Sequence, residues 1–327
     1  MRDLLKRRFF SVKLALRKMK AKKFIKYTAL LVVFLLVFTE LILRLYWGFC
    51  DAVLMKEDLA FEYIAQPNQN RFRFRRHIIY NEFSMRCDSV KKNSVKILGF
   101  GDSVINGGTL TDQDSLATTK LSKSLSSFFD TDMQVLNISA GSWGPDNCAA
   151  YLTKYGDFNA KLILLVVSSH DAYDNMDFGK IVGVSPSFPN KQYAFALWEL
   201  WDRYVKPKIF GQNYSDDLGI NKRKADDSFN SGFEKILEHA QQKNIPMLIY
   251  LHPDKLEVQE KKYNEQGSEI IKFAEQNKIT LIKELNFGIN ENDFRDDIHL
   301  NESGQRKMFN NLYPQIKMMI EKSVLLK

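Results

Sequence analysis

The sequence predicts a three-layer α/β/α sandwich with a mainly parallel β-sheet, preceded by one N-terminal transmembrane helix. After Val95, apolar stretches of strand length alternate with stretches of helical periodicity. These strands are rich in Val, Ile and Leu without polar alternation, which is typical of a parallel sheet covered by helices on both faces. The composition of the 327 residues, 45% hydrophobic and 26% charged, excludes a disordered chain. The sequence contains no fixed-period repeat, which excludes a solenoid.

A basic arm occupies residues 1–26. It holds eleven of the 47 Lys and Arg residues and a single acid, Asp3. The rest of the chain holds 36 basic and 38 acidic residues. The net charge of +8 therefore belongs to the arm, and we expect no nucleic-acid partner.

The apolar stretch Tyr27–Trp47 predicts the transmembrane helix. At ~1.5 Å per residue it is about 31 Å long, enough to cross the hydrocarbon core of a bilayer. Its two charges, Glu40 and Arg44, are spaced i to i+4 and can pair. The positive-inside rule places the N-terminus in the cytoplasm and everything after residue 48 across the inner membrane. The alternative is a cleaved signal peptide, but the basic region is long and no small-x-small cleavage site follows.

Residues 48–94 are predicted to be a connector with short strands. The alternation RFRFRR at 71–76 predicts a strand with one charged face, which is either solvated or contacts phosphate or an anionic glycan. The three cysteines allow one disulfide at most and do not indicate a disulfide-stabilised scaffold.

The region 95–327 is predicted to form one α/β domain with an aromatic insert at 180–225. Strands are expected within 95–103, 133–142, 161–171, 245–254 and 279–285, and helices within 113–127, 146–155, 228–243, 256–277 and 302–323. Ligands of open parallel sheets bind beyond the carboxyl ends of the strands. Polar residues at those ends are therefore the candidate functional residues.

Three of these strand ends carry such residues. Ser103, in GFGDSVINGG, lies where a strand gives way to a helix, so its hydroxyl can point into the crevice as a nucleophile. Gly141 and Ser142, in NISAGSWGPDN, can direct backbone N–H groups at a ligand. His170 and Asp171 follow a fully apolar strand, either as a helix cap or as part of a site. Each motif, taken singly, also fits an ordinary turn.

The loop FRDDIHLNESGQ near the C-terminus places Asp296 three residues before His299. A carboxylate at this spacing can hold the imidazole Nδ1–H and leave Nε2 free to take a proton from a serine hydroxyl. A lone Asp-x-x-His also occurs in surface loops, and Asp297 competes with Asp296, although spacing favours Asp296. The five histidines show no metal-ligand spacing, so neither a metal nor a cofactor is expected.

In this order, the motifs resemble the SGNH (GDSL-type) hydrolase superfamily, and in particular its membrane-anchored bacterial members. The blocks of that family begin with a Gly-Asp-Ser nucleophile turn and end with Asp-x-x-His, a match that here runs from about residue 95 to about 323. Upstream, QPNQNRFRF and YNEFSMR resemble a Pro-Asn and Asn-x-x-Gly-[Phe/Met]-Arg pattern, with Ser84 where Gly is usual. The resemblance implies the flavodoxin-like SGNH fold.

The resemblance also implies roles for the matched residues. Ser103 matches the nucleophile, His299 the general base and then acid, and Asp296 the residue that orients the imidazole. The N–H groups of Ser103 and of Gly141 or Ser142 match the oxyanion donors.

The third block departs from the family pattern. His170 stands where the family has the Asn whose amide completes the oxyanion hole. An imidazole N–H can donate to an oxyanion in one tautomer or when protonated. Either His170 substitutes chemically as an oxyanion donor, or the site is tuned for something other than generic ester hydrolysis.

Four further residues are candidates for lining the substrate crevice. Asp171 and His252 stand at strand ends, and Trp198 and Trp201 belong to the aromatic insert. The insert is placed to form a wall or lid, because aromatic faces suit sugars and acyl chains. The alternative is that these residues serve packing and loop structure.

Together these features predict a membrane-anchored serine esterase that removes acyl groups, acetyl foremost, from cell-surface or other glycans. Its catalytic domain is expected to be periplasmic or otherwise extracytoplasmic, and its partners to be an acylated glycan or other ester substrate and the membrane. One alternative is a glycan O-acyltransferase with the same triad, supplied by a membrane acyl-donor partner. Another is a catalytically weak glycan-binding or assembly subunit.

Overall fold

A five-stranded parallel β-sheet forms the centre of the computed structural model, which describes residues 2–210 and 228–325. Its strands are β5 (Val95–Gly101), β6 (Met133–Ser139), β7 (Leu162–Ser168), β8 (Met247–His252) and β9 (Thr280–Lys283). Their order in the sheet is β6-β5-β7-β8-β9, with every neighbouring pair parallel. The chain passes from β5 outward to β6 and then crosses to β7, so the strand order reverses at β5. Such a switch point is where open α/β sheets bind their ligands.

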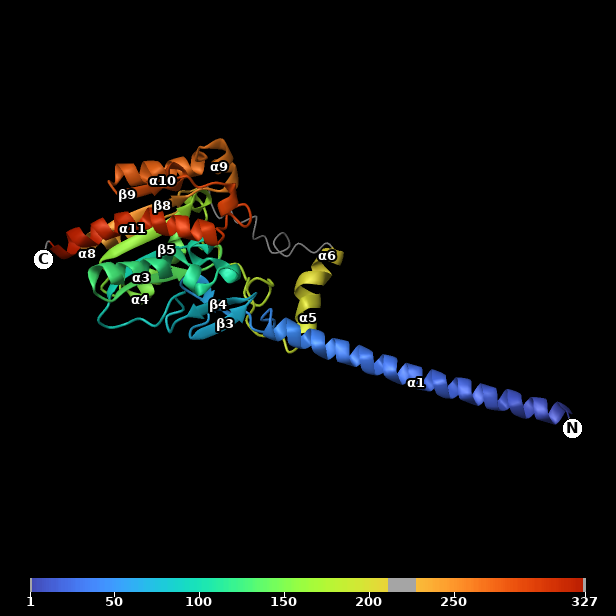
Figure 1. Cartoon of the computed structure of the whole chain (residues 1–327). Helices are drawn as coiled ribbons and strands as arrows, with labels where there is room; N and C mark the ends of the chain where they lie inside the picture. The colour runs from blue at the N-terminus through green and yellow to red at the C-terminus, as the bar shows by residue number, and fades with distance from the viewer. Residues whose placement is uncertain (1, 211–227, 326–327) are drawn as a thin grey trace.

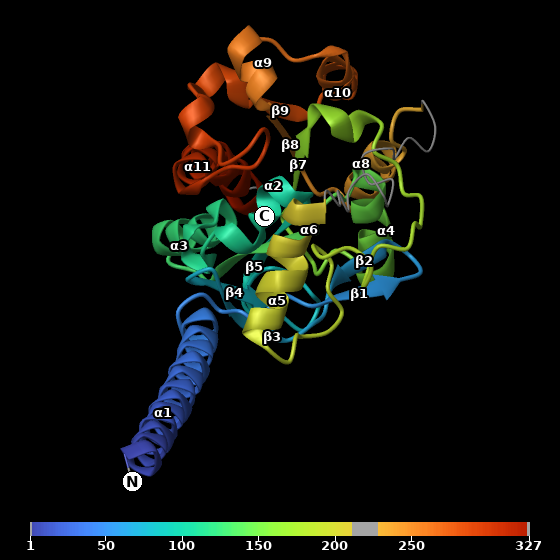
Figure 2. The same cartoon turned by 90° about the vertical axis from the view of Figure 1, so that its right-hand side faces the viewer.

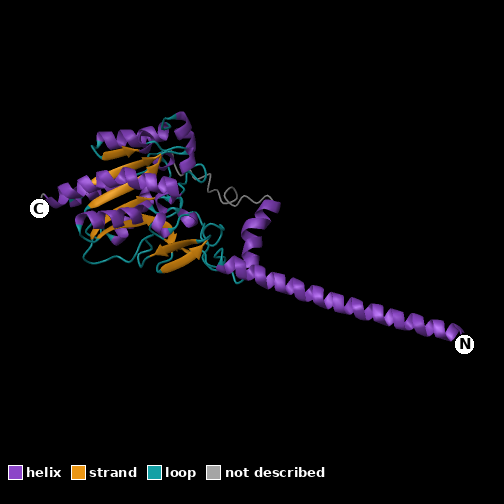
Figure 3. Ribbon diagram, in the orientation of Figure 1, coloured by secondary structure: helices purple, strands orange, loops and turns teal. Residues whose placement is uncertain are grey.

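Helices cover both faces of this sheet, as Figures 1 and 3 show. They are α2 (Ser103–Asn106), α3 (Ala117–Phe129), α4 (Pro145–Tyr155), α8 (Gly232–Lys243), α9 (Lys255–Glu260), α10 (Glu265–Gln276) and α11 (Glu302–Leu325). One apolar cluster joins α3 and α11 to the sheet, and a second joins α4, α8 and α10 to its other face. The predicted three-layer α/β/α sandwich is therefore confirmed.

The predicted helix at 256–277 is instead two helices, α9 and α10. Asp254 caps α9 by accepting from the N–H of Glu257, and Asn264 caps α10 by accepting from the N–H of Gly267. Lys261, between them, ends α9 in the left-handed conformation. Two local caps therefore divide a continuous helical pattern.

Two antiparallel hairpins lie within residues 48–94. Strands β1 (Met55–Asp58) and β2 (Glu62–Ala65) form the first, and β3 (Gln69–Arg73) and β4 (Arg76–Tyr80) form the second. Buried side chains of both hairpins, including Tyr63 and Ile78, belong to the apolar cluster that covers one face of the sheet. This stretch has the short strands that were expected, and it is also part of the folded body.

The N-terminal helix α1 (Arg2–Leu45) projects away from the domain (Figure 1). Its segment Met19–Leu45 is long and apolar enough to cross a membrane, as an anchor or as a signal sequence. Glu40 and Arg44 form the expected pair, with the guanidinium 2.6 Å from the carboxylate.

A helical arm, which carries the aromatic residues of the insert, stands beside the C-terminal end of α1, next to the domain (Figures 1 and 2). It consists of α5 (Ala196–Leu200), a π-helical turn (Trp201–Val205) and α6 (Lys206–Phe210). The part of the predicted insert at 211–225 lies outside the described residues.

Candidate active site

The nucleophile turn follows β5 directly. The strand ends at Gly101, where an added Cβ would lie 2.4 Å from the carbonyl oxygen of Val166 on β7, so only glycine fits this close approach. Asp102 caps α2 by accepting from the N–H of Val104 at 2.8 Å. Ser103 is the first residue of α2, so its N–H has no acceptor within the helix.

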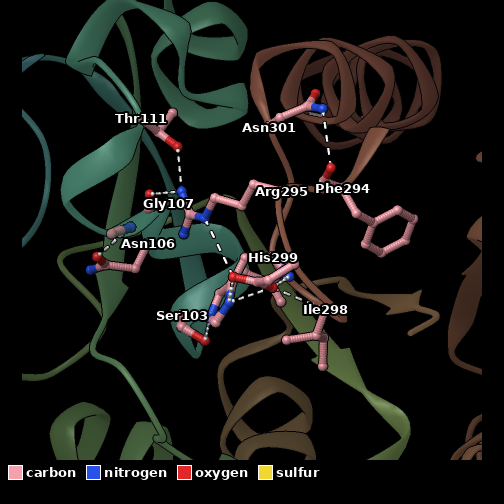
Figure 4. A network of polar contacts seen from close by, with 12 residues as sticks. Ser103, Asn106, Gly107, Thr111, Phe294, Arg295, Ile298, His299 and Asn301 are labelled. Atoms are coloured by element: carbon pink, nitrogen blue, oxygen red, sulfur yellow. Dashed lines mark hydrogen bonds and ion pairs between the residues drawn. The ribbon is translucent and has the colours of Figure 1, made fainter. Parts of the chain in front are cut away.

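The structure brings Ser103, His299 and Asp296 together in one chain of hydrogen bonds. The Nε2 atom of His299 lies 2.9 Å from Oγ of Ser103, and Nδ1 lies 2.9 Å from each carboxylate oxygen of Asp296. Figure 4 shows the imidazole of His299, from the loop before α11, beside Ser103 at the start of α2. Residues separated by 196 positions therefore meet at the carboxyl edge of the sheet.

Local backbone geometry holds Asp296 in this orientation. Its Oδ1 atom accepts from the N–H groups of Ile298 and His299, at 3.1 and 2.8 Å. Burial alone would raise the pKa of Asp296, but these N–H groups and the imidazole lower it below its ordinary value. Asp297 accepts a backbone hydrogen bond from Lys255 through its carbonyl, and Asp296 is the acid that faces the imidazole.

A pocket of about 500 Å³ opens beside the triad. Ser103, His299 and Asp296 line it together with Gly141 of the loop after β6. Its remaining walls carry aromatic and basic side chains, among them Phe74, Tyr80, Phe188, Arg203, Tyr204 and Arg295. Such a lining combines apolar surface with a few polar groups that can fix a ligand's orientation.

The two predicted oxyanion donors after β6 lie differently. Gly141 lines the pocket, whereas Ser142 is not among the described residues that line it and adopts a positive φ of 57°. The hydroxyl of Tyr63 donates to the carbonyl oxygen of Gly141 at 2.8 Å, which ties this loop to the first hairpin. The geometry favours the N–H of Gly141 as the donor, because it belongs to the residue that faces the pocket.

His170 lies against two carboxylates rather than along the pocket. Its Nε2 is 3.6 Å from Oδ1 of Asp171 and 3.9 Å from Oδ2 of Asp102. Desolvation would lower the pKa of His170, whose side chain is still 45% exposed, but these two acids raise it above its ordinary value. The ligand atoms of the three residues lie within 4.8 Å of one another, so they could hold a metal ion. The role of His170 as an oxyanion donor stays a prediction.

The four predicted substrate contacts are not among the described residues that line the pocket, and their role stays a prediction. His252 is fully buried, with Nδ1 2.5 Å from Glu284 and Nε2 2.8 Å from the carbonyl oxygen of Ile298. Asp171 is buried and accepts from the N–H of Ser168 at 2.7 Å. Trp198 and Trp201 are exposed on the insert, whose Arg203 and Tyr204 line the pocket instead.

Arg86 supports the loop beside the site, a role that the sequence analysis did not assign. It is fully buried and donates to the carbonyl oxygens of Asn106, Gly108 and Thr111. These residues form the loop after α2, which supplies one wall of the pocket. Its signal was the Arg that ends YNEFSMR. Ser84, at the usual Gly position of that pattern, has a φ of 64°, a conformation that glycine adopts most easily.

Arg295 is a second residue that the sequence analysis missed. It directly precedes Asp296, lines the pocket, and donates through NH1 to the carbonyl oxygen of Gly107 at 2.9 Å (Figure 4). Burial lowers the pKa of its guanidinium, while nearby Asp296 raises it. Arg295 therefore links the loop of the base to the loop of the nucleophile.

The arginines of the motif RFRFRR have partners within the chain. Arg73 is buried against Glu199 at 2.6 Å, and the guanidinium of Arg75 lies over the ring of Tyr46, 4.9 Å from its centroid. Arg71 pairs with Asp51 at 3.1 Å and Arg76 with Glu302 at 3.0 Å. These contacts give the motif a structural role at the junction of the hairpins with the rest of the chain.

The fold and the site place the serine of the hydrogen-bonded Ser-His-Asp group directly after the first strand of the parallel sheet and the histidine in the loop before the last helix, which is the order of elements expected from the sequence resemblance to SGNH hydrolases. No protein-family model and no curated protein matches this chain.

Solved structures similar to this chain include hydrolases. A protein assigned to the G-D-S-L lipolytic family, from Desulfitobacterium hafniense DCB-2, is 11% identical over 68% of this chain and 99% of that one, with a TM-score of 0.40. TesA is 14% identical over 69% and 99%, with a TM-score of 0.41. A lipase/acylhydrolase from Enterococcus faecalis is 12% identical over 68% and 95%, with a TM-score of 0.39. The triad assignment rests on the geometry of Ser103, His299 and Asp296 and not on these likenesses.

Proposed function

We propose that this protein is a membrane-anchored serine esterase of the SGNH type that removes acyl groups, acetyl above all, from glycans outside the cytoplasm. The observation that carries the proposal is the unbroken hydrogen-bond chain from Asp296 through His299 to Ser103. A serine hydroxyl needs an adjacent oriented base to act as a nucleophile near neutral pH, and this chain supplies one.

The first half of the reaction forms an acyl-enzyme. Oγ of Ser103 attacks the ester carbonyl carbon while Nε2 of His299 takes the hydroxyl proton. The resulting oxyanion accepts hydrogen bonds from the N–H groups of Ser103 and Gly141. His299 then gives its proton to the leaving sugar oxygen, and the carbon–oxygen bond of the ester breaks.

The second half releases the acid. A water molecule gives a proton to His299 and attacks the acyl carbon, and Ser103 leaves with the proton that His299 returns. Asp296 stabilises the imidazolium in both halves, since its carboxylate faces Nδ1 through two oxygens. The chain's own residues therefore suffice for each proton transfer.

Two features support a glycan as the carrier of the acyl group. The pocket walls hold aromatic rings, including Phe74, Phe188 and Tyr204, whose faces suit the apolar faces of sugar rings. The basic arm before α1 favours a cytoplasmic N-terminus, which leaves the catalytic domain on the side of the membrane where surface polymers lie.

Hydrolysis of p-nitrophenyl acetate by the full chain in detergent tests the proposal. We expect nitrophenol release that Ser103→Ala abolishes, and a fluorophosphonate probe should label the wild type on Ser103. Unchanged hydrolysis in Ser103→Ala would remove the triad assignment. An acetylated glycan then identifies the carrier, and addition of an unacylated acceptor glycan separates the two outcomes, since acetate signals hydrolysis and acylated acceptor signals transfer.

A further inference from the structure

The helical arm formed by α5, the π-helical turn and α6 exposes an apolar face. Phe195, Trp198, Ile209 and Phe210 are 65%, 57%, 60% and 65% exposed. Large apolar side chains this exposed and this close in sequence mark a surface that contacts another apolar phase.

The opposite face of the same arm is buried, and it holds a charged side chain beside Ala196, which packs in an apolar cluster with Leu43 and Phe49. Glu199, which directly follows Trp198, is fully buried and lies 2.6 Å from Arg73 and 2.9 Å from Arg203. It also accepts from the N–H of Cys50 at 2.6 Å. The amphipathic pattern is therefore inverted relative to a helix on a water-facing surface, which buries its apolar stripe and exposes its charges.

The arm is attached to the C-terminal end of α1. Both carboxylate oxygens of Glu40 accept from α5, one from the N–H of Ala196 at 2.8 Å and the other from the N–H of Leu197 at 2.9 Å. Arg44 pairs with Glu40 and donates to the carbonyl oxygen of Ala194. The charges of the membrane segment thus serve as the cap of a second helix.

The arm runs crosswise to α1, as Figures 1 and 3 show. An apolar groove lies where the two meet, lined by Leu36, Val37 and Leu41 of α1 and by Phe195 and Trp198 of the arm. The exposed apolar surface of the arm is therefore continuous with that of the spanning segment. A helix crosswise to a spanning helix lies along the plane of the membrane.

We propose that the helical arm lies in the interface of the bilayer that α1 crosses, with Phe195, Trp198, Ile209 and Phe210 among the upper acyl chains. This inference rests on the proposed anchoring by α1. Interfacial helices bury an apolar face at the boundary between headgroups and acyl chains, and Trp is enriched there. Lys208, exposed beside Ile209, suits a lipid phosphate.

The arm also connects the bilayer to the active site. Arg203 and Tyr204 belong to its π-helical turn and line the pocket that contains Ser103. The start of α11, next to His299, lies at the end of the domain that faces α1, while the C-terminus lies at the far end (Figure 1). The pocket therefore opens beside the membrane surface, and the ester substrate is met there.

Tryptophan quenching by brominated phosphatidylcholine tests this placement in the full chain reconstituted into vesicles. The chain has four tryptophans: Trp47 after α1, Trp143 in the core, and Trp198 and Trp201 on the arm. We expect bromines near the headgroup end of the acyl chains to quench the wild type. The variant Trp198→Phe/Trp201→Phe should lose most of this quenchable emission, because only Trp47 then remains in the interface. The matched control Trp47→Phe should keep it.

Equal bromolipid quenching in the wild type and the Trp198→Phe/Trp201→Phe variant would overturn the inference, as would wild-type emission from the arm that aqueous acrylamide quenches and bromolipid does not. A second copy or another protein covering the arm would produce protection from both quenchers and also overturns it. Flotation with the vesicles tests the anchoring separately, and p-nitrophenyl acetate hydrolysis in the same samples tests the esterase separately.

Discussion

The substitution Asp296→Asn isolates the contribution of the triad carboxylate, and Asp297→Asn provides a control one residue away. In the wild type, Asp296 faces Nδ1 of His299 at 2.9 Å through both oxygens. A carboxylate and an imidazolium at this distance interact by ~1.4 kcal/mol at the dielectric constant of water and ~5.7 kcal/mol at an effective value of 20. The side chain of His299 is 30% exposed and that of Asp296 is 50% exposed, which places the interaction energy in the lower half of that range.

We therefore expect Asp296→Asn to lower kcat/KM for p-nitrophenyl acetate by about 10²-fold, which corresponds to about 2.7 kcal/mol at 1.36 kcal/mol per factor of ten. The amide that replaces the carboxylate also permits the wrong imidazole tautomer, which adds to the loss. Asp297→Asn should stay within about threefold of the wild type, because surface substitutions away from such contacts have small effects. Near-wild-type activity of Asp296→Asn, or an equal loss in both variants, would refute this account of how the base is oriented.

Three further predictions concern stability and follow from buried charges. Arg86→Met should lower the free energy of unfolding by about 3 kcal/mol, because each of three loop carbonyls loses a buried donor, and urea titration measures it; a loss below about 1 kcal/mol would contradict the role of Arg86 as a loop clamp. Glu199→Ala should lower the free energy of unfolding by about 3–5 kcal/mol, because it leaves Arg73 buried without its counter-charge. The double variant Arg73→Met/Glu199→Leu should recover part of this free energy in the same urea titration. Asp293→Asn should destabilise the protein at pH 7: burial would raise the pKa of Asp293, but Lys307 and neighbouring donors lower it. A lowered pKa contributes stability above the ordinary value of about 3.9 that is lost as the pH falls through the folded-state pKa, so the gap in melting temperature between variant and wild type should close on acidification; a gap that widens at low pH would show that the sign is wrong.

The sheet was predictable because its strands are apolar on both faces. β5, β6, β7 and β8 are rich in Val, Ile and Leu, with Lys96, Gln134 and Asn137 as polar interruptions, and each strand is buried along nearly its whole length. β9 is shorter and only partly buried, at the edge of the sheet, and its run ITLIKEL was found for the same reason. Hydrophobic periodicity did not predict the break between α9 and α10, because a single capping residue such as Asn264 begins a new helix without changing the apolar pattern.

The geometry of the site was predictable where the chain itself fixes it. Asp296 and His299 are three residues apart in one loop, so their contact needs no long-range information. The crevice lining was not predictable, because burial of a side chain depends on what packs above it. His252 illustrates this: it stands at a strand end, as a ligand-binding residue would, yet Glu284 and the backbone of Ile298 take both ring nitrogens.

The arm shows a second limit of sequence reasoning. The sequence predicts that its aromatic residues form a wall or lid of the substrate crevice, since they follow the third strand of the sheet. In the structure the charged residue Arg203 and the phenol Tyr204 reach the pocket, while the tryptophans face outward. Spacing alone identifies the stripe, but it cannot tell which side of the helix the rest of the chain covers.

The hydroxyl of Tyr63 donates to the carbonyl oxygen of Gly141, so the hairpin that follows α1 supports the loop that lines the pocket. A catalytic domain on a long flexible linker could reach a substrate far from its attachment point. Here the hairpins after α1 are packed into the domain, so under the proposed anchoring Ser103 would be held at a fixed distance from the bilayer. Under that proposal the substrate has to reach the active site near the bilayer, and lengthening the junction after residue 48 would weaken this positioning rather than extend the reach of the domain.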